Sequence, residues 1–325
     1  MPDLRSALRA VAGRRLVVVG DLILDAFTHG TVERMSPEAP VPVLRQERTR
    51  QRASGAAAAA QAAAALGARV EVLGAVGEDE EGRLIGELLG RAGIRTGLIR
   101  TPDRPTTLKT RMVGNGQHLL RVDRETTTAL PPPYARRLRE LLRAALDTAD
   151  AVLISDYAKG VCAPDLIRSV IDAARARSAP VVVDPKSPDP RVYAGATAVT
   201  PNQREFAAFC ASLGCSADTP HRSGRRLCAA AGFSALLITR AADGMTVVAG
   251  EHVEDLPALN QEPVDVAGAG DVAAAVLALS LAAGLTPSDG ARLASVACGL
   301  VVGRWEYAVT PADMCEGARR FGVPL

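Results

Sequence analysis

The chain has 325 residues, of which 48% are hydrophobic and 23% charged, the composition of a globular protein with a sizeable core. A net charge of +2 and only 3% aromatic residues do not favour a nucleic-acid partner or an anionic membrane surface. The sequence contains no run of 18 apolar residues, so we expect no membrane span. The six cysteines are scattered without a C-x-x-C pair, which argues against a zinc site and fits a reducing, cytoplasmic location.

Strand-like and helical segments alternate along most of the chain. An amphipathic stretch, 1–15, predicts a leading helix packed on the domain, because no apolar signal region follows it. The next segment, RLVVVGD, is a continuous apolar run, typical of a parallel strand buried on both faces. Similar runs are RVEVLGAVG, AVLISDY, APVVVDP, ATAVTPN and ALLITR, and helical stretches between them span 56–66, 80–92, 134–146, 164–176 and 203–213. This alternation predicts a doubly wound, mostly parallel α/β sheet flanked by helices.

Two segments interrupt the alternation. Residues 29–50 and 106–125 show strand-like periodicity with turn residues and no helical period. They predict a small β-sheet lid inserted at about 28–50 and 97–125, although ordinary surface hairpins fit the same pattern. A lid excludes water and completes a site when it closes. The apolar alternation in APVPVLR leaves an edge strand that favours cover, so we expect a homodimer through the lids.

The motif GAGD, residues 268–271, lies immediately before an apolar helix. Small residues allow backbone N–H groups to approach a ligand closely, and the start of a helix favours a phosphoryl group. The carboxylate of Asp271 is suited to accept a proton from an attacking hydroxyl, but the pattern alone supports a helix cap equally well. The chain has no Walker A motif and no G-x-G-x-x-G after its first strand, so neither a P-loop nor a dinucleotide-binding domain is expected.

Polar residues at the ends of the predicted strands are candidates for binding, because ligands of open α/β sheets lie outside the carboxyl ends of the strands. On the predicted lid, Lys109 and Arg111 alternate along one strand and therefore face the same way. Two cations on one face suit a phosphate group, and a solvated edge strand is the alternative explanation.

Three motifs together resemble the ribokinase-type, or PfkB, family of carbohydrate kinases: VVVGDLILD, TPNQREF and DVAGAGD. The resemblance covers essentially the whole chain. The strings ERMSPEAPVPVLR, TLKTRMVGNGQHLLRVD, ISDYAKGV and VVVDPKSPDPRVYAGATAVTPNQREF are similar to one branch, the heptose 7-phosphate kinases of bacterial ADP-heptose biosynthesis. This resemblance implies a ribokinase-like domain over 1–325. Its implied reaction phosphorylates the anomeric hydroxyl of D-glycero-β-D-manno-heptose 7-phosphate to the 1,7-bisphosphate with ATP and Mg²⁺.

The resemblance also implies the role of each site residue. The catalytic set is the base with its anion hole: Asp271, Gly268, Ala269 and Gly270. The residues implied to bind the substrate are Asp21, Asp25, Gly55, Lys109, Arg111, Asp123, Asp156 and Lys159. Those implied to bind ATP are Lys186, Asn202, Thr239, Arg240 and Gly244. Asn202 and Glu205 are the implied ligands of Mg²⁺, a cation that prefers oxygen donors.

The sequence departs from the family pattern at several positions. Ser54 replaces the first of two glycines, and Ala58 stands where the family has an asparagine that binds the sugar. Loss of such a contact costs about 1–3 kcal/mol when its partner is left unpaired. Ala267 and Val272 replace threonines, and bulky Trp305-Glu306 replaces small residues near the adenine. These departures leave open a kinase for another sugar phosphate or a nucleoside, and a pseudokinase that binds sugar phosphate without turnover.

Overall fold

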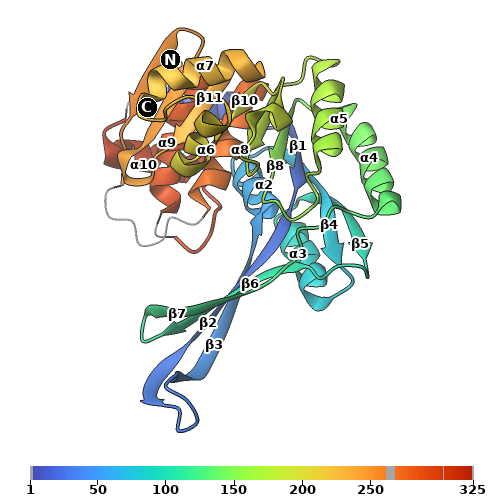
Figure 1. Ribbon diagram of the computed structural model, residues 1–325. Coiled ribbons are helices and arrows are strands. Elements are labelled where there is room, and N and C mark those ends of the chain that lie inside the picture. The colour runs from blue at the N-terminus through green and yellow to red at the C-terminus, as the bar shows by residue number, and fades with distance from the viewer. Residues whose placement is uncertain (1–2, 261–267, 303, 324–325) are drawn as a thin grey trace.

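The computed structural model describes residues 3–260, 268–302 and 304–323, and within these ranges two sheets form the scaffold (Figure 1). The larger sheet has nine strands in the order β13-β12-β11-β10-β9-β8-β1-β4-β5. Their bounds are Arg15–Gly20 (β1), Arg69–Gly77 (β4), Arg95–Thr101 (β5), Ala151–Ser155 (β8), Val181–Asp184 (β9), Ala198–Val199 (β10), Ala235–Thr239 (β11), Met245–Ala249 (β12) and His252–Leu256 (β13). The strands from β11 to β5 are parallel, and only β12 and β13 pair antiparallel at the edge.

The apolar runs form this sheet because both of its faces are covered by helices. Side chains of β1 alternate between two hydrophobic cores, with Leu16 and Val18 on one face and Val17 and Val19 on the other. The helices that supply the first core are α1 (Leu4–Val11), α2 (Ala56–Ala65), α3 (Glu80–Arg91), α8 (Ala269–Ala282), α9 (Pro287–Val301) and α10 (Pro311–Phe321). Those that supply the second are α4 (Pro132–Leu146), α5 (Pro164–Arg175), α6 (Gln203–Ser212) and α7 (Pro220–Ala231), with the short 3₁₀ helix η1 (Pro190–Tyr193).

The predicted doubly wound fold is confirmed, and the leading helix is α1. No helix among the described residues is long and apolar enough to cross a membrane. The cytoplasmic location stays a prediction.

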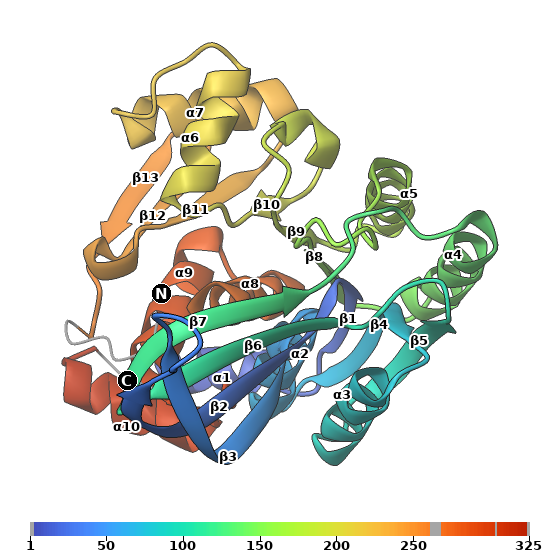
Figure 2. The ribbon, with the colours of Figure 1, turned by 60° about the horizontal axis from the view of Figure 1, so that its bottom comes forward.

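The smaller sheet, which we call the lid sheet, has the strand order β3-β2-β6-β7 and extends away from the body (Figure 1). Its strands are β2 (Leu22–Met35), β3 (Pro42–Gly55), β6 (Thr107–Gly114) and β7 (Gln117–Arg124). Figure 2 shows the four strands side by side. A separate small sheet is therefore confirmed, but its expected bounds need correction. The first two strands reach back to Leu22 and forward to Gly55, and 97–101 lies in β5 of the larger sheet, paired with β4.

The two sheets meet where the site residues lie. β1 ends at Gly20, and β2 of the lid sheet begins two residues later. At the other end of the lid hairpin, Gly55 has a φ of 64° and is the N-cap residue of α2. A Cβ built on Gly55 would lie 2.6 Å from the carbonyl oxygen of Asp21, so only glycine allows this close junction. The predicted substrate role of Gly55 stays a prediction beside this structural one.

Candidate active site

Asp271 lies in the first turn of α8, buried, with 2% of its surface exposed. The residue that caps the helix is Gly268, and no side chain forms a capping hydrogen bond there. Asp271 instead accepts a hydrogen bond at Oδ1 from the hydroxyl of Tyr157, 2.9 Å away. The carboxylate therefore points away from its own helix, which argues against the helix-cap interpretation.

The electrostatic surroundings of Asp271 favour a proton acceptor. Burial raises the pKa of its carboxyl well above the usual range, and the negative charges of Asp184 and Asp25 raise it further. The hydrogen bond from Tyr157 and the charge of Arg52 act in the opposite direction. A raised pKa increases the affinity of the carboxylate for a proton, as a general base requires.

The backbone before Asp271 is held in a conformation that favours glycine. Gly268 has a φ of 87°, and a Cβ added to it would lie 2.0 Å from Cε1 of Tyr307. The first N–H groups of a helix have no partner within it, so those of Ala269 and Gly270 are available to an anion. Ala269 and Gly270 also line a cavity of about 630 Å³. This geometry fits the predicted anion hole.

The same cavity contains most of the residues predicted to bind the nucleotide. It is lined by Asn202, Thr239 and Gly244 on one side and by α9 on the other. Gly244 follows the 3₁₀ helix η2 (Ala241–Asp243) with a φ of 86°, and a Cβ there would lie 2.0 Å from the Leu256 carbonyl oxygen. This sharp turn in the cavity wall therefore requires a glycine at position 244.

Asn202 and Glu205 form a capping box at the start of α6. The side-chain oxygen of Asn202 accepts the N–H groups of Arg204 (2.9 Å) and Glu205 (3.0 Å). Oε2 of Glu205 accepts the N–H of Asn202 (3.0 Å), and Oε1 accepts Nζ of Lys186 (3.2 Å). Glu205 therefore has a structural role at the start of α6, and its role as a metal ligand stays a prediction.

A further carboxyl, that of Asp184, lies close enough to Glu205 for the two to interact electrostatically. Asp184, at the end of β9, is buried, and burial together with the charge of Glu205 raises its pKa to about 7. Among the described residues, its carboxyl accepts one hydrogen bond, from the Thr200 hydroxyl (3.2 Å). Two carboxyls and an amide oxygen within one site are the donor set that a hard divalent cation prefers, so these residues fit such a metal.

The lid sheet contributes a cluster of buried charges. Arg111 donates from Nη1 to Oδ1 of Asp25 (2.6 Å), and Nε of Arg52 lies 3.9 Å from Oδ2 of the same carboxylate. Strand register places Arg52, Asp25, Lys109 and Asp123 in one row across the four strands. Neighbours in register share a face, so the predicted Lys109 and Arg111 pair lies on the face that carries Asp25.

These observations place Asp271 next to both the cavity at Ala269 and Gly270 and the charged cluster of the lid sheet. Comparison with known proteins gives this arrangement a chemistry. The model of the pfkB family carbohydrate kinases matches residues 14–309. The chain belongs to this family. It is therefore a phosphotransferase that acts on an alcohol group of a sugar, and PfkB membership implies ATP and a divalent metal.

Curated relatives of this PfkB kinase include two named bifunctional protein HldE. The one from Geobacter sulfurreducens is 42% identical over 301 residues, covering 92% of this chain and 61% of that protein. The one from Rhodopseudomonas palustris is 42% identical over 320 residues, covering 97% and 65%. The chain thus spans less than two thirds of the length of these relatives.

Solved structures share the fold of this PfkB kinase. Arabidopsis thaliana ribokinase complexed with ribose and ATP matches with a TM-score of 0.72 at 19% identity, covering 94% of this chain and 98% of that one. Phosphofructokinase-2 from Escherichia coli in complex with substrates and products matches with a TM-score of 0.79 at 17% identity, covering 95% and 99%. The ribokinase-like fold is confirmed.

Asp21 of the PfkB kinase has a structural function in the site. Its two carboxylate oxygens accept the backbone N–H groups of Tyr157 (2.9 Å), Lys159 (3.0 Å) and Val161 (3.0 Å). Asp21 therefore holds the loop that positions Tyr157, the partner of Asp271. Its predicted contact with the sugar remains a prediction.

The other substrate residues predicted from sequence are mostly engaged within the protein. Asp156 accepts the Tyr193 hydroxyl (2.6 Å) and a backbone N–H, and Lys159 donates to Glu125 (2.6 Å). Asp156 and Asp21 also lie close to Cys162, but these hydrogen bonds account for the grouping without a metal.

Arg240 and Asp123 likewise have protein partners. Arg240 pairs with Asp255 (3.2 Å), and Asp123 accepts Nε of Arg121 (2.9 Å). Lys109 is half-buried, which lowers the pKa of its amine. Among the described residues its amine forms no hydrogen bond, so the amine is available to a ligand.

Three residues of the site were not predicted from sequence: Tyr157, Arg52 and Tyr307. Asp184, in the DPK string, stands at the end of a predicted strand and so belongs to the polar strand-end candidates for binding, although no role was assigned to it. Arg52 is enclosed by three rings, with its Cζ 4.6 Å from the Tyr307 centroid, 5.0 Å from Trp305 and 5.2 Å from Phe27. Such long-range packing leaves no local pattern. Ala267 lies outside the described residues, and Ala58 is fully buried in α2.

Proposed function

We propose that this kinase phosphorylates the anomeric hydroxyl of D-glycero-β-D-manno-heptose 7-phosphate, using ATP and Mg²⁺ and giving the 1,7-bisphosphate. The observation that carries the proposal is the position of buried Asp271 between the nucleotide cavity and the cationic face of the lid sheet. The branch-specific strings and the relatives named HldE support the heptose assignment.

In this reaction, the residues around Asp271 and those of the cavity have different roles. Asp271 accepts the proton of the anomeric hydroxyl as its oxygen attacks the γ-phosphorus of ATP, and the bond between that phosphorus and the β,γ-bridging oxygen breaks to release ADP. The N–H groups of Ala269 and Gly270 stabilise the negative charge of the transferring group. Thr239 and Gly244 would contact the ATP in the cavity, whereas Arg240 is paired with Asp255.

Glu205, Asn202 and Asp184 would hold the magnesium ion, which neutralises phosphate charge when bound. Lys186, whose amine is already paired with Glu205, would exchange that partner for a phosphate oxygen. Cation binding next to Asp184 favours its ionised form, because a nearby positive charge lowers a carboxyl pKa.

Lys109 and Arg111 would bind the 7-phosphate. Lys109 is half-buried and lacks a hydrogen-bond partner among the described residues, and Arg111 lies on the same strand face. Asp25 and Asp123 lie in the same row and would accept hydrogen bonds from sugar hydroxyls. Lys159 lies close enough to Lys109 to affect its pKa, and adds to the positive charge at this end.

The substrate is tested by measuring ADP release with Mg²⁺-ATP and a panel of acceptors. We expect turnover with the β-heptose 7-phosphate and at least 10²-fold lower kcat/KM with the unphosphorylated heptose and with nucleosides. Preferred turnover of another sugar phosphate or a nucleoside would contradict the heptose assignment. Binding of sugar phosphates without ADP release from any acceptor would favour the pseudokinase.

We also propose that two copies associate through their lid sheets. Large apolar side chains are exposed on this sheet, including Leu120 (61%), Met35 (56%) and Val122 (49%). Apolar side chains on an open sheet favour cover by another chain. Light scattering should give the mass of a dimer at micromolar concentration and of a monomer for Leu120→Glu. A monomeric wild type would contradict this proposal.

A further inference from the structure

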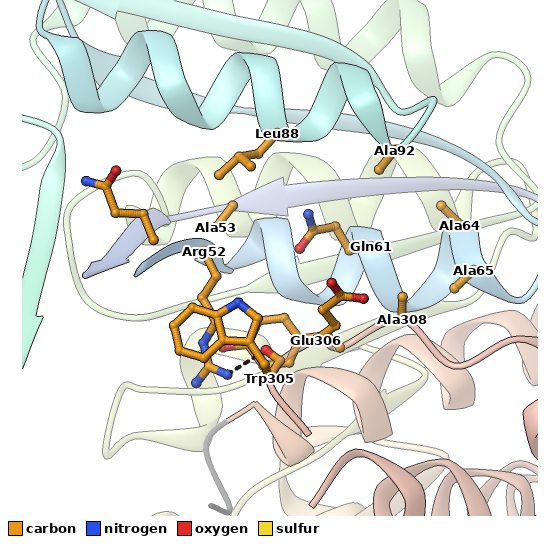
Figure 3. Close-up of a pocket in the computed structure, with 12 residues that line it drawn as sticks. Arg52, Ala53, Gln61, Ala64, Ala65, Leu88, Ala92, Trp305, Glu306 and Ala308 are labelled. Carbon is orange, nitrogen blue, oxygen red and sulfur yellow. Dashed lines mark hydrogen bonds between the residues drawn. The ribbon is translucent and has the colours of Figure 1, made fainter. Parts of the chain in front are cut away.

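A second cavity, which we call the α2 cavity, lies beside Trp305 and Glu306 (Figure 3). Its volume is about 390 Å³, and its walls come from β3, α2, α3 and the segment 305–308. Among the residues that the structure describes, it shares no lining residue with the cavity at Ala269 and Gly270. The Trp305-Glu306 pair, which departs from the family pattern, therefore lines the α2 cavity and not the one proposed for the nucleotide.

Small apolar side chains form much of the wall of the α2 cavity. Gln61 is the one residue of α2 that is not alanine, and Ala64 and Ala65 follow it by three and four positions. Side chains at this spacing share one face of a helix, and all three line the cavity. Leu88 of α3 adds a further apolar wall. These walls suit a short aliphatic chain, and the amide of Gln61 offers a polar contact.

Glu306 gives the α2 cavity a negative charge. Its carboxylate forms no hydrogen bond or ion pair among the described residues, and Figure 3 shows it directed toward α2 and away from the Arg52 guanidinium. That guanidinium is buried, donates from Nη1 to the carbonyl oxygen of Trp305 (2.9 Å) and lies with its Nε 3.9 Å from Oδ2 of Asp25. Arg50 packs over the Trp305 ring, 4.0 Å from its centroid. The charge that Glu306 offers to a ligand therefore favours a cation and disfavours a phosphate.

A guanidinium matches these groups better than an ammonium. Its planar N–H groups can donate two parallel hydrogen bonds to one carboxylate, and the amide oxygen of Gln61 can accept another. We propose that the α2 cavity binds a small alkylguanidinium ion, with Glu306 as the partner of the guanidinium and the alanines of α2 against the alkyl chain. The proposal goes beyond the sugar kinase activity and does not depend on which sugar the enzyme uses.

The single tryptophan of the chain, Trp305, is a specific probe of this cavity. The test follows its indole N–H resonance in a ¹H–¹⁵N spectrum while n-butylguanidinium is added. We expect a saturable shift with a millimolar Kd, since Glu306 is exposed and exposed ion pairs are weak. N-butylurea, which has nearly the same shape and no charge, should give no saturable shift at the same concentrations.

Two variants test the role of the carboxylate. Glu306→Gln removes the charge at constant size and should weaken the binding of butylguanidinium about tenfold. Glu316→Gln, which removes an exposed charge on α10, should leave the Kd unchanged. A saturating, non-hydrolysable ATP analogue should also leave the Kd unchanged, because the nucleotide is proposed to occupy the other cavity.

Three results would overturn the inference: no saturable shift, equal responses to butylguanidinium and butylurea, or equal Kd values for the wild type and Glu306→Gln. Competition between butylguanidinium and the ATP analogue would also overturn it, because that result would place the cation in the nucleotide cavity. Each of these measurements is made without a sugar, so its outcome is separate from the test of the proposed substrate.

Discussion

The proposed nucleotide side and the proposed sugar side of the candidate active site differ in how they are built. The nucleotide side is a cavity of about 630 Å³, and Lys186, the partner of Glu205, leaves 49% of its side chain exposed. On the sugar side, Asp25 and Arg52 expose only 4% and 6% of their side chains. Rings of Phe27, Trp305 and Tyr307 surround the Arg52 guanidinium.

This difference indicates where specificity resides. Backbone groups and small residues line the nucleotide cavity and can receive a phosphate chain with little side-chain rearrangement. The sugar side is a packed set of charges, where an unsuitable ligand would leave a buried group unpaired. A changed substrate preference is therefore expected to come from the lid sheet and from 305–307, while the reaction stays the same.

The largest expected effect on turnover is that of replacing Asp271, which lies between the two sides. Asp271→Asn retains the size of the side chain and removes the proton acceptor, so kcat should fall by about 10²–10⁴-fold. Nucleotide affinity and melting temperature should remain near those of the wild type. Near-normal turnover would remove Asp271 from the mechanism.

Truncation of Lys109 on the lid sheet should change the KM for the sugar substrate and not the KM for ATP. Lys109→Ala is expected to raise the KM for the 7-phosphate sugar by about 10–100-fold, because one charge-assisted hydrogen bond to phosphate is lost. The KM for ATP should be unchanged. Arg45→Ala, on the same sheet with 68% of its side chain exposed, is the matched control. Equal effects of the two variants would contradict a phosphate site at Lys109.

On the nucleotide side, Asp184→Asn should increase stability at high pH. The folded pKa of Asp184 is raised from 3.8 to about 7, so its contribution favours folding at acid pH and is lost as the pH rises from about 4 to 7. The variant avoids this loss, and its melting temperature at pH 8 should exceed that of the wild type by a few degrees, with little difference near pH 4. Asp172→Asn, at an exposed position, should show no such trend.

The smallest expected effect is a shift in pH dependence. Tyr157→Phe removes the hydrogen bond that lowers the pKa of Asp271, so this pKa should rise further. Since the base acts when deprotonated, the acid limb of the kcat–pH profile should move to higher pH, with a similar plateau. An unshifted limb would show that Tyr157 does not influence the base.

The sequence predicted the larger sheet well because strands buried on both faces have unbroken apolar runs. It did not predict β5, where RTGLIRT carries an arginine near each end and has two exposed residues at its start. The glycine-rich surroundings singled out Asp271, and the resemblance to the PfkB family, not the pattern, favoured a base over a helix cap. Tyr157 and Tyr307 were not recognised, because they reach Asp271 only through contacts that separate segments make in the fold.

The most direct test of the account is ³¹P NMR of the wild-type chain with Mg²⁺-ATP and D-glycero-β-D-manno-heptose 7-phosphate. One new phosphate ester, coupled to the anomeric proton, should form for each ADP released. Inorganic phosphate alone, or a phosphate on another carbon, would contradict a base at Asp271 directed at the anomeric oxygen.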